Sequence, residues 1–293
     1  MKLRLALVLG FSALGTLQAQ NLPIGGHFIP GTTGLNATAE VPPGFYVRDF
    51  NLFYRADRVA GLPLAAQAVF FGQAPRFIWV SPGKFAGAVW VAHVTVPLIY
   101  KELKTPLGSK HQAGLGDIQI EPLLLLWHRA NVSLGAGYAL FVPSGQFTAA
   151  TALRRLTSPG KGFWSHMFVL GGDWRCGDAK AWVISLTGHF EIAGAQAQTR
   201  ATPGDNFTVE GGISRRIRSG LDAGIMFYDQ HQFTVDRGIH AAPERAHVSG
   251  LGPEIRFVWP SRRTALSFSF ATEFGARAHT EGRFMLLSLT RRF

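Results

Sequence analysis

Apolar and polar side chains alternate along most of the chain after residue 44. On residues 264–275, for example, Leu266 and Phe268 fall on one face, whereas Ser267 and Ser269 fall on the other. A period of two residues is typical of β-strands. About twelve such stretches occur, each roughly 10 to 15 residues long, which is the length that a tilted strand needs to cross the hydrocarbon layer of a membrane. The pattern therefore predicts an all-β protein built from long strands.

The connections between these stretches alternate in length. The predicted strands cover residues 45–56, 66–80, 85–100, 116–127, 131–143, 163–175, 180–193, 206–216, 220–231, 247–259, 264–275 and 282–293. The short connections are 81–84, 128–131, 176–180, 216–220 and 260–263, and the clearest long ones are 101–115, 144–162, 194–205 and 232–246. Bacterial outer-membrane barrels have short turns at the periplasmic rim, longer loops at the other rim and an even number of antiparallel strands. We therefore expect an antiparallel transmembrane β-barrel of about twelve strands over residues 45–293.

A soluble β-sandwich would show the same alternation, so the period alone does not distinguish the two architectures. In a sandwich the apolar face lies in the protein interior, whereas in a membrane barrel it meets lipid. The predicted strands are longer than the roughly five or six residues that are usual in soluble proteins. Aromatic residues such as Trp79, Trp127 and Trp259 stand near strand ends, where the interfacial belt of a membrane barrel contains them. These two features favour the barrel.

The last predicted strand ends on an aromatic residue. Leu287, Leu289 and Phe293 are the residues that we expect to close the barrel and to serve as the signal for the barrel assembly machinery. Arg291 falls on the same face, close enough to the terminus for its guanidinium group to reach the lipid headgroups.

The amino-terminal residues predict export from the cytoplasm. Residues 1–19 resemble a secretory signal peptide, because Lys2 and Arg4 precede an apolar run that ends shortly before the small residue Ala19. That run is shorter than the roughly 18 apolar residues of a spanning helix, and no later stretch reaches that length. Residues 20–44 are rich in Gly, Pro and Thr and have no strand pattern. This segment either folds into the lumen as a plug or lies in the periplasm, and the sequence does not decide between these positions.

The charge and cysteine content agree with an exported membrane protein. The formal net charge is +11 at pH 7. For an exported chain the counter-charge is anionic lipid or lipopolysaccharide, so we expect contact with outer-membrane lipids and no nucleic-acid partner. Cys176 is the only cysteine, so the chain has no internal disulfide. The expected location is the outer membrane of a Gram-negative bacterium.

Motifs for catalysis or for cofactors are weak in this sequence. The tetrapeptide "SPGK" at 81–84 matches the Ser-x-x-Lys of penicillin-recognising enzymes, but the partner motifs of those enzymes are missing. The ten histidines have neither helical metal-ligand spacing nor a cysteine cluster. We therefore expect no catalytic residue, no metal and no cofactor.

Charged side chains on the predicted inward faces are the best indication of function. These candidates for the lumen lining are Asp49, Asp117, Glu121, Glu191, Glu210, Arg216, Glu254, Arg256 and Glu273. One interpretation is a charge ladder that selects what crosses the lumen. The other, which we favour, is that the charges pair across strands and so fill and stiffen a narrow barrel.

Several stretches resemble a known family of outer-membrane proteins. They are "PPGFYVRDFNLFYRADR" (42–58), "GLGDIQIEPLLLLWH" (114–128), "ALFVPSGQF" (139–147), "GLGPEIRF" (250–257) and "EFGARAHTEGRFMLLSLTRRF" (273–293). They are similar to the phenol-degradation meta-pathway family, which includes the FapF-type exporters of functional amyloid. The resemblance implies a twelve-stranded outer-membrane channel, often associated with the catabolism of aromatic compounds. The chain departs from the family at Arg291, where members commonly have an aromatic residue, and it lacks the long coiled-coil extension of the amyloid exporters.

Together these features predict a barrel that lets small hydrophobic or aromatic compounds pass without catalysis. The substrate class comes from the resemblance alone, because the pattern of residues predicts only a barrel with a polar, charged interior. Three alternatives stay open: an exporter of a polypeptide, a membrane-embedded barrel hydrolase and a purely structural barrel. The sequence does not identify the solute, the direction of transport or the oligomeric state.

Overall fold

The computed structural model describes residues 23–61, 65–106, 108–238 and 241–293. The predicted signal peptide, residues 1–19, lies outside these ranges. The strands are β1 (Gly44–Val59), β2 (Gln67–Phe85), β3 (Ala88–Thr95), β4 (Leu98–Thr105), β5 (Gly108–Leu115), β6 (Ile118–His128), β7 (Val132–Val142), β8 (Ser165–Cys176), β9 (Trp182–Ala193), β10 (Asn206–Arg218), β11 (Leu221–Gln232), β12 (His247–Trp259), β13 (Thr264–Arg277) and β14 (Thr280–Arg292).

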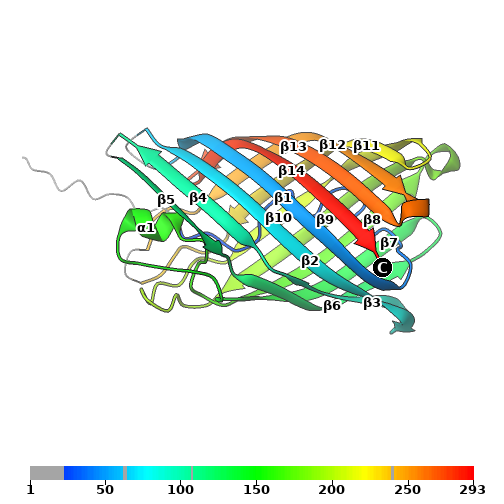
Figure 1. Cartoon of the computed structure of the whole chain (residues 1–293), viewed down its shortest axis with the longest axis horizontal. Coiled ribbons are helices and arrows are strands. Elements are labelled where there is room, and N and C mark those ends of the chain that lie inside the picture. Colours follow the sequence, from blue (N-terminus) through cyan, green and yellow to red (C-terminus); the bar gives the residue numbers. More distant parts are fainter. Residues whose placement is uncertain (1–22, 62–64, 107, 239–240) are drawn as a thin grey trace, which may run out of the picture.

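These strands form one closed antiparallel sheet. From β6 to β14 each strand pairs with the next along the chain. β6 pairs with β3, β3 pairs with β2, and β1 pairs with both β2 and β14, which closes the barrel (Figure 1). At the closure, the backbone N–H of Phe293 donates to the carbonyl of Phe45 at 2.9 Å. The predicted transmembrane barrel is therefore confirmed.

The barrel has twelve strand positions, because two of the positions are each filled by a pair of strands. β3 and β4 are separated by Val96 and Pro97 alone, and together they pair with β2. β5 and β6 are likewise separated by Gly116 and Asp117. The prediction of a loop over 101–115 was wrong, since β4 and β5 form a hairpin there. This hairpin projects beyond the apolar band, where outward side chains are polar and the alternation that marks a strand is lost.

The two rims of the barrel differ as the connection lengths predict. The short-turn rim has tight connections at 86–87, 129–131, 177–181, 219–220 and 260–263, including the 3-10 turns η1 (Asp178–Lys180) and η2 (Pro260–Arg262). The long-loop rim includes the connections 143–164, 194–205 and 233–246, and α1 (Ala152–Thr157) lies in the first of them, at the left of Figure 1. Among the described residues, no helix is long and apolar enough to cross a membrane.

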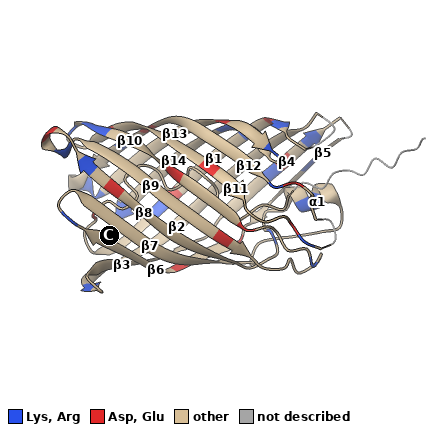
Figure 2. Ribbon diagram, turned by 180° about the vertical axis from the view of Figure 1, so that it is seen from behind, with Lys and Arg blue, Asp and Glu red and all other residues tan. Residues whose placement is uncertain are grey.

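The outer wall exposes large apolar side chains. Leu170, Ile225 and Leu186 are 70%, 60% and 54% exposed, and they belong to three different strands. In the ribbon coloured by charge, Lys and Arg lie mostly toward the two ends of the barrel (Figure 2). A wall of this kind is stable only against lipid, because so much contiguous apolar surface in water would promote association. The fold is thus that of an outer-membrane barrel.

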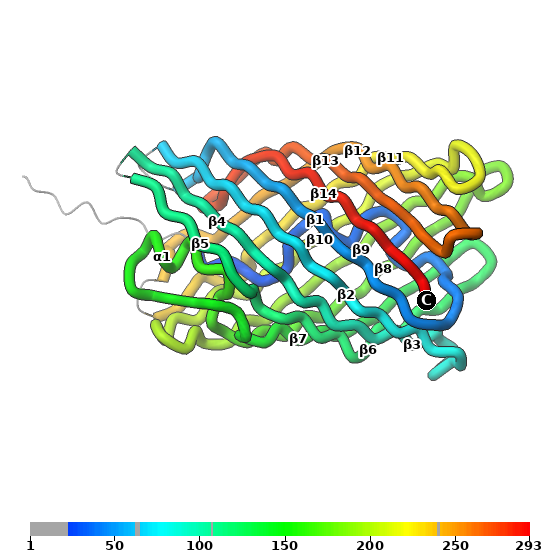
Figure 3. Tube along the Cα trace, in the orientation of Figure 1, coloured from blue at the N-terminus to red at the C-terminus, as the bar shows by residue number. Residues whose placement is uncertain are grey.

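The interior has an apolar side as well as a polar one. Phe50 and Leu52 of β1 are each 6% exposed, and they pack inside the barrel with Phe284 and Leu286 of β14. Most of the other inward side chains are polar or charged, and many of them are buried by a chain segment that lies within the lumen. That segment is the amino-terminal stretch before β1, drawn in dark blue in Figure 3.

Candidate functional site

The described part of the amino-terminal segment, residues 23–43, runs through the lumen along the barrel axis. Ile24 lies at the long-loop rim, where its backbone N–H donates to Asp236 of the 233–246 connection at 3.1 Å. Thr38 lies toward the short-turn rim, where it contacts Asp173 of β8. The sequence left open whether this segment lies in the lumen or in the periplasm, and in the structure its described residues lie inside the barrel. We call residues 23–43 the luminal segment.

Five carboxylates bind the luminal segment in succession, and we call them the carboxylate ladder. From the long-loop rim they are Asp236, Glu191, Glu210, Glu254 and Asp173. Each accepts at least one backbone N–H from the segment. A buried carboxylate is stable only when it is paired or hydrogen-bonded, and bonds to an ionised acceptor are about twice as strong as neutral ones.

Glu191 makes the densest set of these bonds. The backbone N–H of His27 donates to its Oε1 at 2.7 Å, and that of Phe28 donates to its Oε2 at 3.1 Å. Ser165 of the neighbouring strand donates to Oε1 at 2.7 Å, which fixes the carboxylate from the wall side. Both oxygens of Glu191 are therefore engaged by different residues of the luminal segment.

The three ladder carboxylates nearest the short-turn rim also accept backbone N–H groups of the luminal segment. Gly31 donates its N–H to Glu210 at 2.7 Å, and the Thr33 hydroxyl donates to the same carboxylate. Leu35 donates its N–H to Glu254 at 3.1 Å. Thr38 donates to Asp173 through its N–H at 3.0 Å and its hydroxyl at 2.7 Å. Between these bonds, the Leu35 side chain packs into the apolar cluster of β1 and β14.

The imidazole of His27 joins two carboxylates that come from different walls. Its Nε2 lies 3.0 Å from Asp117, and its Nδ1 lies 3.0 Å from Glu191. The ring also stacks on Phe141, with 4.8 Å between the ring centroids. Asp117 in turn accepts the backbone N–H groups of Gly145 and Lys161, at 2.9 and 2.6 Å, which ties the 143–164 connection to the same site.

Lys161 contacts the luminal segment from that connection. Its Nζ donates to the backbone carbonyls of Gly25 and Gly26. Burial lowers the pKa of Lys161, and the nearby carboxylates of Glu191, Asp117 and Asp236 oppose that shift. The Lys161 ammonium group therefore helps to hold the end of the luminal segment that lies at the long-loop rim.

Glu121, Glu273, Arg256 and Arg216, which were also predicted to line the lumen, make no hydrogen bond or ion pair to the luminal segment in the described part of the chain. Glu121 of β6 faces inward and pairs with the Nε2 of His93 at 2.9 Å. Glu273 of β13 accepts the hydroxyls of Tyr54 and Tyr228, at 2.7 and 2.9 Å. Arg256 falls in the inward register of β12 with Glu254, two residues away along the strand. Arg216 is more than half exposed near the short-turn rim, 3.7 Å from Asp222.

The position of Asp49 differs from the expected one. Its neighbours Phe50 and Leu52 are the inward residues of β1, so Asp49 lies on the outer face with Phe53, which is 40% exposed. There Asp49 accepts from the side chains of Asn51 and Gln73, at 3.0 and 3.1 Å. The expectation that Asp49 lines the lumen was wrong, because both faces of β1 carry aromatic residues and the alternation does not identify the inner one.

Sequence reasoning missed several residues of this site. Asp173 occupies an inward position of β8, and its polar register was a usable signal. Asp236 lies in a long connection, and His27 lies in a segment without periodicity, so no pattern indicated either. Arg48 and Arg76 also face inward, with their guanidinium carbons 4.5 and 4.8 Å from the ring centroid of Phe50.

A cavity of about 450 Å³ lies between the luminal segment and the β1 to β4 side of the wall. Its lining is mainly apolar and aromatic, and it includes Phe28, Phe50, Leu52, Tyr54, Phe70 and Ile99. Several charged residues, among them Arg76, Lys101 and Glu273, also line this space. Cavities of this size and character are typical of small-molecule sites.

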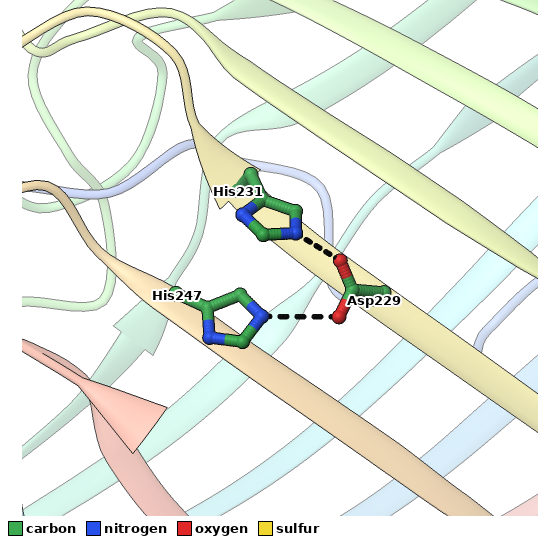
Figure 4. A group of neighbouring side chains, drawn as sticks. All are labelled: Asp229, His231 and His247. Carbon is green, nitrogen blue, oxygen red and sulfur yellow. Dashed lines mark hydrogen bonds and ion pairs between the residues drawn. The ribbon is translucent and has the colours of Figure 1, made fainter. Parts of the chain in front are cut away.

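A separate polar cluster lies on the outer wall, where β11 ends and β12 begins (Figure 4). His247 and Ser249 are two residues apart on β12, and both contact Asp229 of β11. The Ser249 hydroxyl lies 3.4 Å from Nε2 of His247, but Asp229 approaches that same nitrogen at 3.0 Å. In a Ser-His-Asp triad the carboxylate holds the other ring nitrogen. The cluster therefore does not have the geometry of a Ser-His-Asp triad.

Comparison with known proteins identifies the family. The family model described as "Putative MetA-pathway of phenol degradation" matches residues 24–289. The chain belongs to this family. The match covers both the luminal segment and the barrel, and it confirms the family that the sequence motifs predict. Among curated proteins, none matches the chain.

Solved structures with the same fold are outer-membrane proteins. The COG4313 outer membrane channel from Pseudomonas putida F1 is 14% identical, with 87% of this chain and 97% of that one covered and a TM-score of 0.74. The beta domain of the Bordetella autotransporter BrkA is 13% identical, with coverages of 86% and 100% and a TM-score of 0.56. These likenesses establish the fold of this family member as an outer-membrane β-barrel.

Proposed function

We propose that this barrel is a passive channel for small hydrophobic or aromatic compounds, and that the luminal segment controls its opening. The observation that carries the proposal is the aromatic-lined cavity between the segment and the wall. Its volume, about 450 Å³, exceeds the roughly 150 Å³ of an apolar cavity that holds benzene. The family name and the printed name of the Pseudomonas channel support the same class of function.

The chemistry of the luminal segment suits a reversible closure. Four of the five ladder carboxylates project from strands into the lumen, so water can hydrate them when the segment leaves. The segment contributes mainly backbone N–H groups, with few side-chain charges of its own. Its release therefore exchanges protein hydrogen bonds for water hydrogen bonds and leaves no buried charge without a partner. No catalytic step is part of this proposal.

Liposome swelling with a panel of solutes tests the channel. We expect aromatic acids to enter faster than sugars or amino acids of similar size, and deletion of residues 24–40 to accelerate entry. Uptake that is indifferent to solute chemistry would refute the aromatic specificity. A barrel that stays impermeable after the deletion would refute the channel and favour a structural role.

A substitution that fills the cavity tests whether solutes pass through the cavity beside the luminal segment or by another route. Ala74 of β2 lines the cavity, so Ala74→Trp should slow aromatic uptake. The matched control is Leu170→Trp, because Leu170 is 70% exposed on the lipid-facing wall. Equal uptake by both variants would show that the cavity is not on the route.

A further inference from the structure

We propose that Asp229, His231 and His247 form a binding site for a divalent transition-metal ion of the Zn²⁺ class on the outer wall of the barrel. One carboxylate oxygen and two imidazole nitrogens are offered there, and these ligand atoms all lie within 4.8 Å of one another. The site is distinct from the luminal segment and does not depend on the transport proposal. Figure 4 shows both rings directed at the same carboxylate.

The register of two neighbouring strands brings the three ligands together. His231 of β11 and His247 of β12 are paired across the sheet, and Asp229 precedes His231 by two residues on the same face. Directly opposed side chains on antiparallel strands have Cβ atoms about 5 Å apart, which suits two imidazoles that share an ion. The ring centroids of His231 and His247 are 4.2 Å apart.

The two oxygens of Asp229 each face one imidazole. Nε2 of His247 lies 3.0 Å from Oδ2, and Nε2 of His231 contacts Oδ1. A metal ion bound to both Nε2 atoms and to one carboxylate oxygen would hold the three groups together in place of the protons that these nitrogens otherwise share with Asp229. The three groups remain reachable, since their side chains are 35%, 50% and 15% exposed for Asp229, His231 and His247.

Surrounding groups orient two of the three ligands. Nδ1 of His247 lies 3.0 Å from the carbonyl of Gly275, which accepts the proton of this nitrogen and so leaves Nε2 as the atom that would coordinate the ion in place of its contact with Asp229. The hydroxyl of Ser249 donates to Oδ2 of Asp229 at 2.5 Å. Such second contacts are characteristic of metal sites, in which they fix the tautomer and the direction of each ligand.

The donor set selects the kind of ion. Ca²⁺ and Mg²⁺ take oxygen ligands almost exclusively, whereas two imidazoles and one carboxylate suit Zn²⁺ and its neighbours in the transition series. Three protein ligands leave a further coordination position for water or for an anionic group from outside. The outward neighbours Phe227 and Leu251 are apolar, and the cluster lies on the long-loop side of them, toward the headgroups.

Zinc binding to the full chain in detergent, without a polyhistidine tag, tests the site. Competition with a chromogenic chelator should reveal one preferred equivalent of Zn²⁺, and Co²⁺ should give the intense visible absorption of a four-coordinate ion. His231→Gln and His247→Gln should each abolish that equivalent. Ser249→Ala should weaken binding by about 10- to 100-fold, as expected for a residue that orients a ligand.

His166→Gln is the matched control, because His166 is an exposed histidine on β8 that bonds to Tyr138 and, within the described ranges, to no carboxylate. It should bind Zn²⁺ like the unaltered protein. Heat-modified migration on gels identifies folded barrels among the variants, so loss of folding is not read as loss of binding. The proposal is overturned if the unaltered chain shows no preferred equivalent, or if folded His231→Gln binds Zn²⁺ with unchanged affinity.

Discussion

Replacing Glu191 by Gln should weaken the closure of the lumen by a predictable amount. Glu191 accepts the backbone N–H groups of His27 and Phe28 on different oxygens, at 2.7 and 3.1 Å. A glutamine has one acceptor oxygen, so its amide group would face an N–H donor. One hydrogen bond to a charged acceptor is lost, and such bonds contribute about 1.5–3 kcal/mol. The ratio of bound to released luminal segment should therefore fall about 10- to 100-fold.

Single-channel recording in planar bilayers measures this ratio as the closed-to-open dwell time. The matched control is Glu121→Gln, which removes the same charge from another buried inward position. Glu121 pairs with His93 of the wall, and none of its described hydrogen bonds or ion pairs reaches the luminal segment. Glu191→Gln should raise the open fraction, and Glu121→Gln should leave it near that of the unaltered protein.

Two results would refute this reasoning in different ways. Equal effects of the two substitutions would mean that lumen charge, and not the hydrogen bonds to the segment, sets the open fraction. An unchanged Glu191→Gln channel, together with a widely open channel after deletion of residues 24–40, would mean that the segment is held by other contacts. The apolar contacts of Leu35 would then be the first to test.

Three further predictions concern the segment and the wall. Leu35→Ala removes a side chain that is 7% exposed in the apolar cluster, which should cost the bound segment about 2–5 kcal/mol and raise the open fraction in bilayer recordings. Gly31→Ala should also open the channel, because Gly31 has φ +81° and an added Cβ would lie 2.6 Å from the Phe284 ring; normal closure would contradict the position of this residue. Leu287→Arg puts a charge on the lipid-facing wall and should lower the free energy of unfolding in vesicles by about 2–4 kcal/mol, as measured with urea, whereas an unchanged value would place Leu287 outside the bilayer.

The membrane-facing side of the fold was predictable from the sequence because lipid imposes a strict rule on it. Every strand that crosses the bilayer must present apolar side chains outward, as Phe268 and Leu287 do, and this rule leaves a period of two. Outside the bilayer this rule no longer applies, so the hairpin of β4 and β5 lacks the alternation of apolar and polar residues from which a strand could be predicted. On β1 aromatic side chains stand on both faces, and Asp49 was therefore expected in the lumen although it lies on the outer face.

The sites were less predictable, because the interactions join residues far apart in the sequence. Glu191 and Glu210 were identified as inward carboxylates, but their partner is a segment that precedes them by more than 150 residues. No periodicity relates a backbone N–H to the side chain that will accept it. The outer cluster was missed for a similar reason, since His231 and His247 have no helical spacing and meet only through the register of β11 and β12.

The path of the luminal segment also sets the direction in which it can leave. Its covalent continuation is β1, whose first residue, Gly44, lies at the short-turn rim, while Ile24 is bound at the opposite rim. A pull from the short-turn side therefore loads the contacts in a fixed order, beginning with Asp173 and ending with Asp236. Breaking these contacts one at a time takes far less force than shearing all five at once, so we expect a pull from the short-turn rim to release the segment more easily than a push from the long-loop rim.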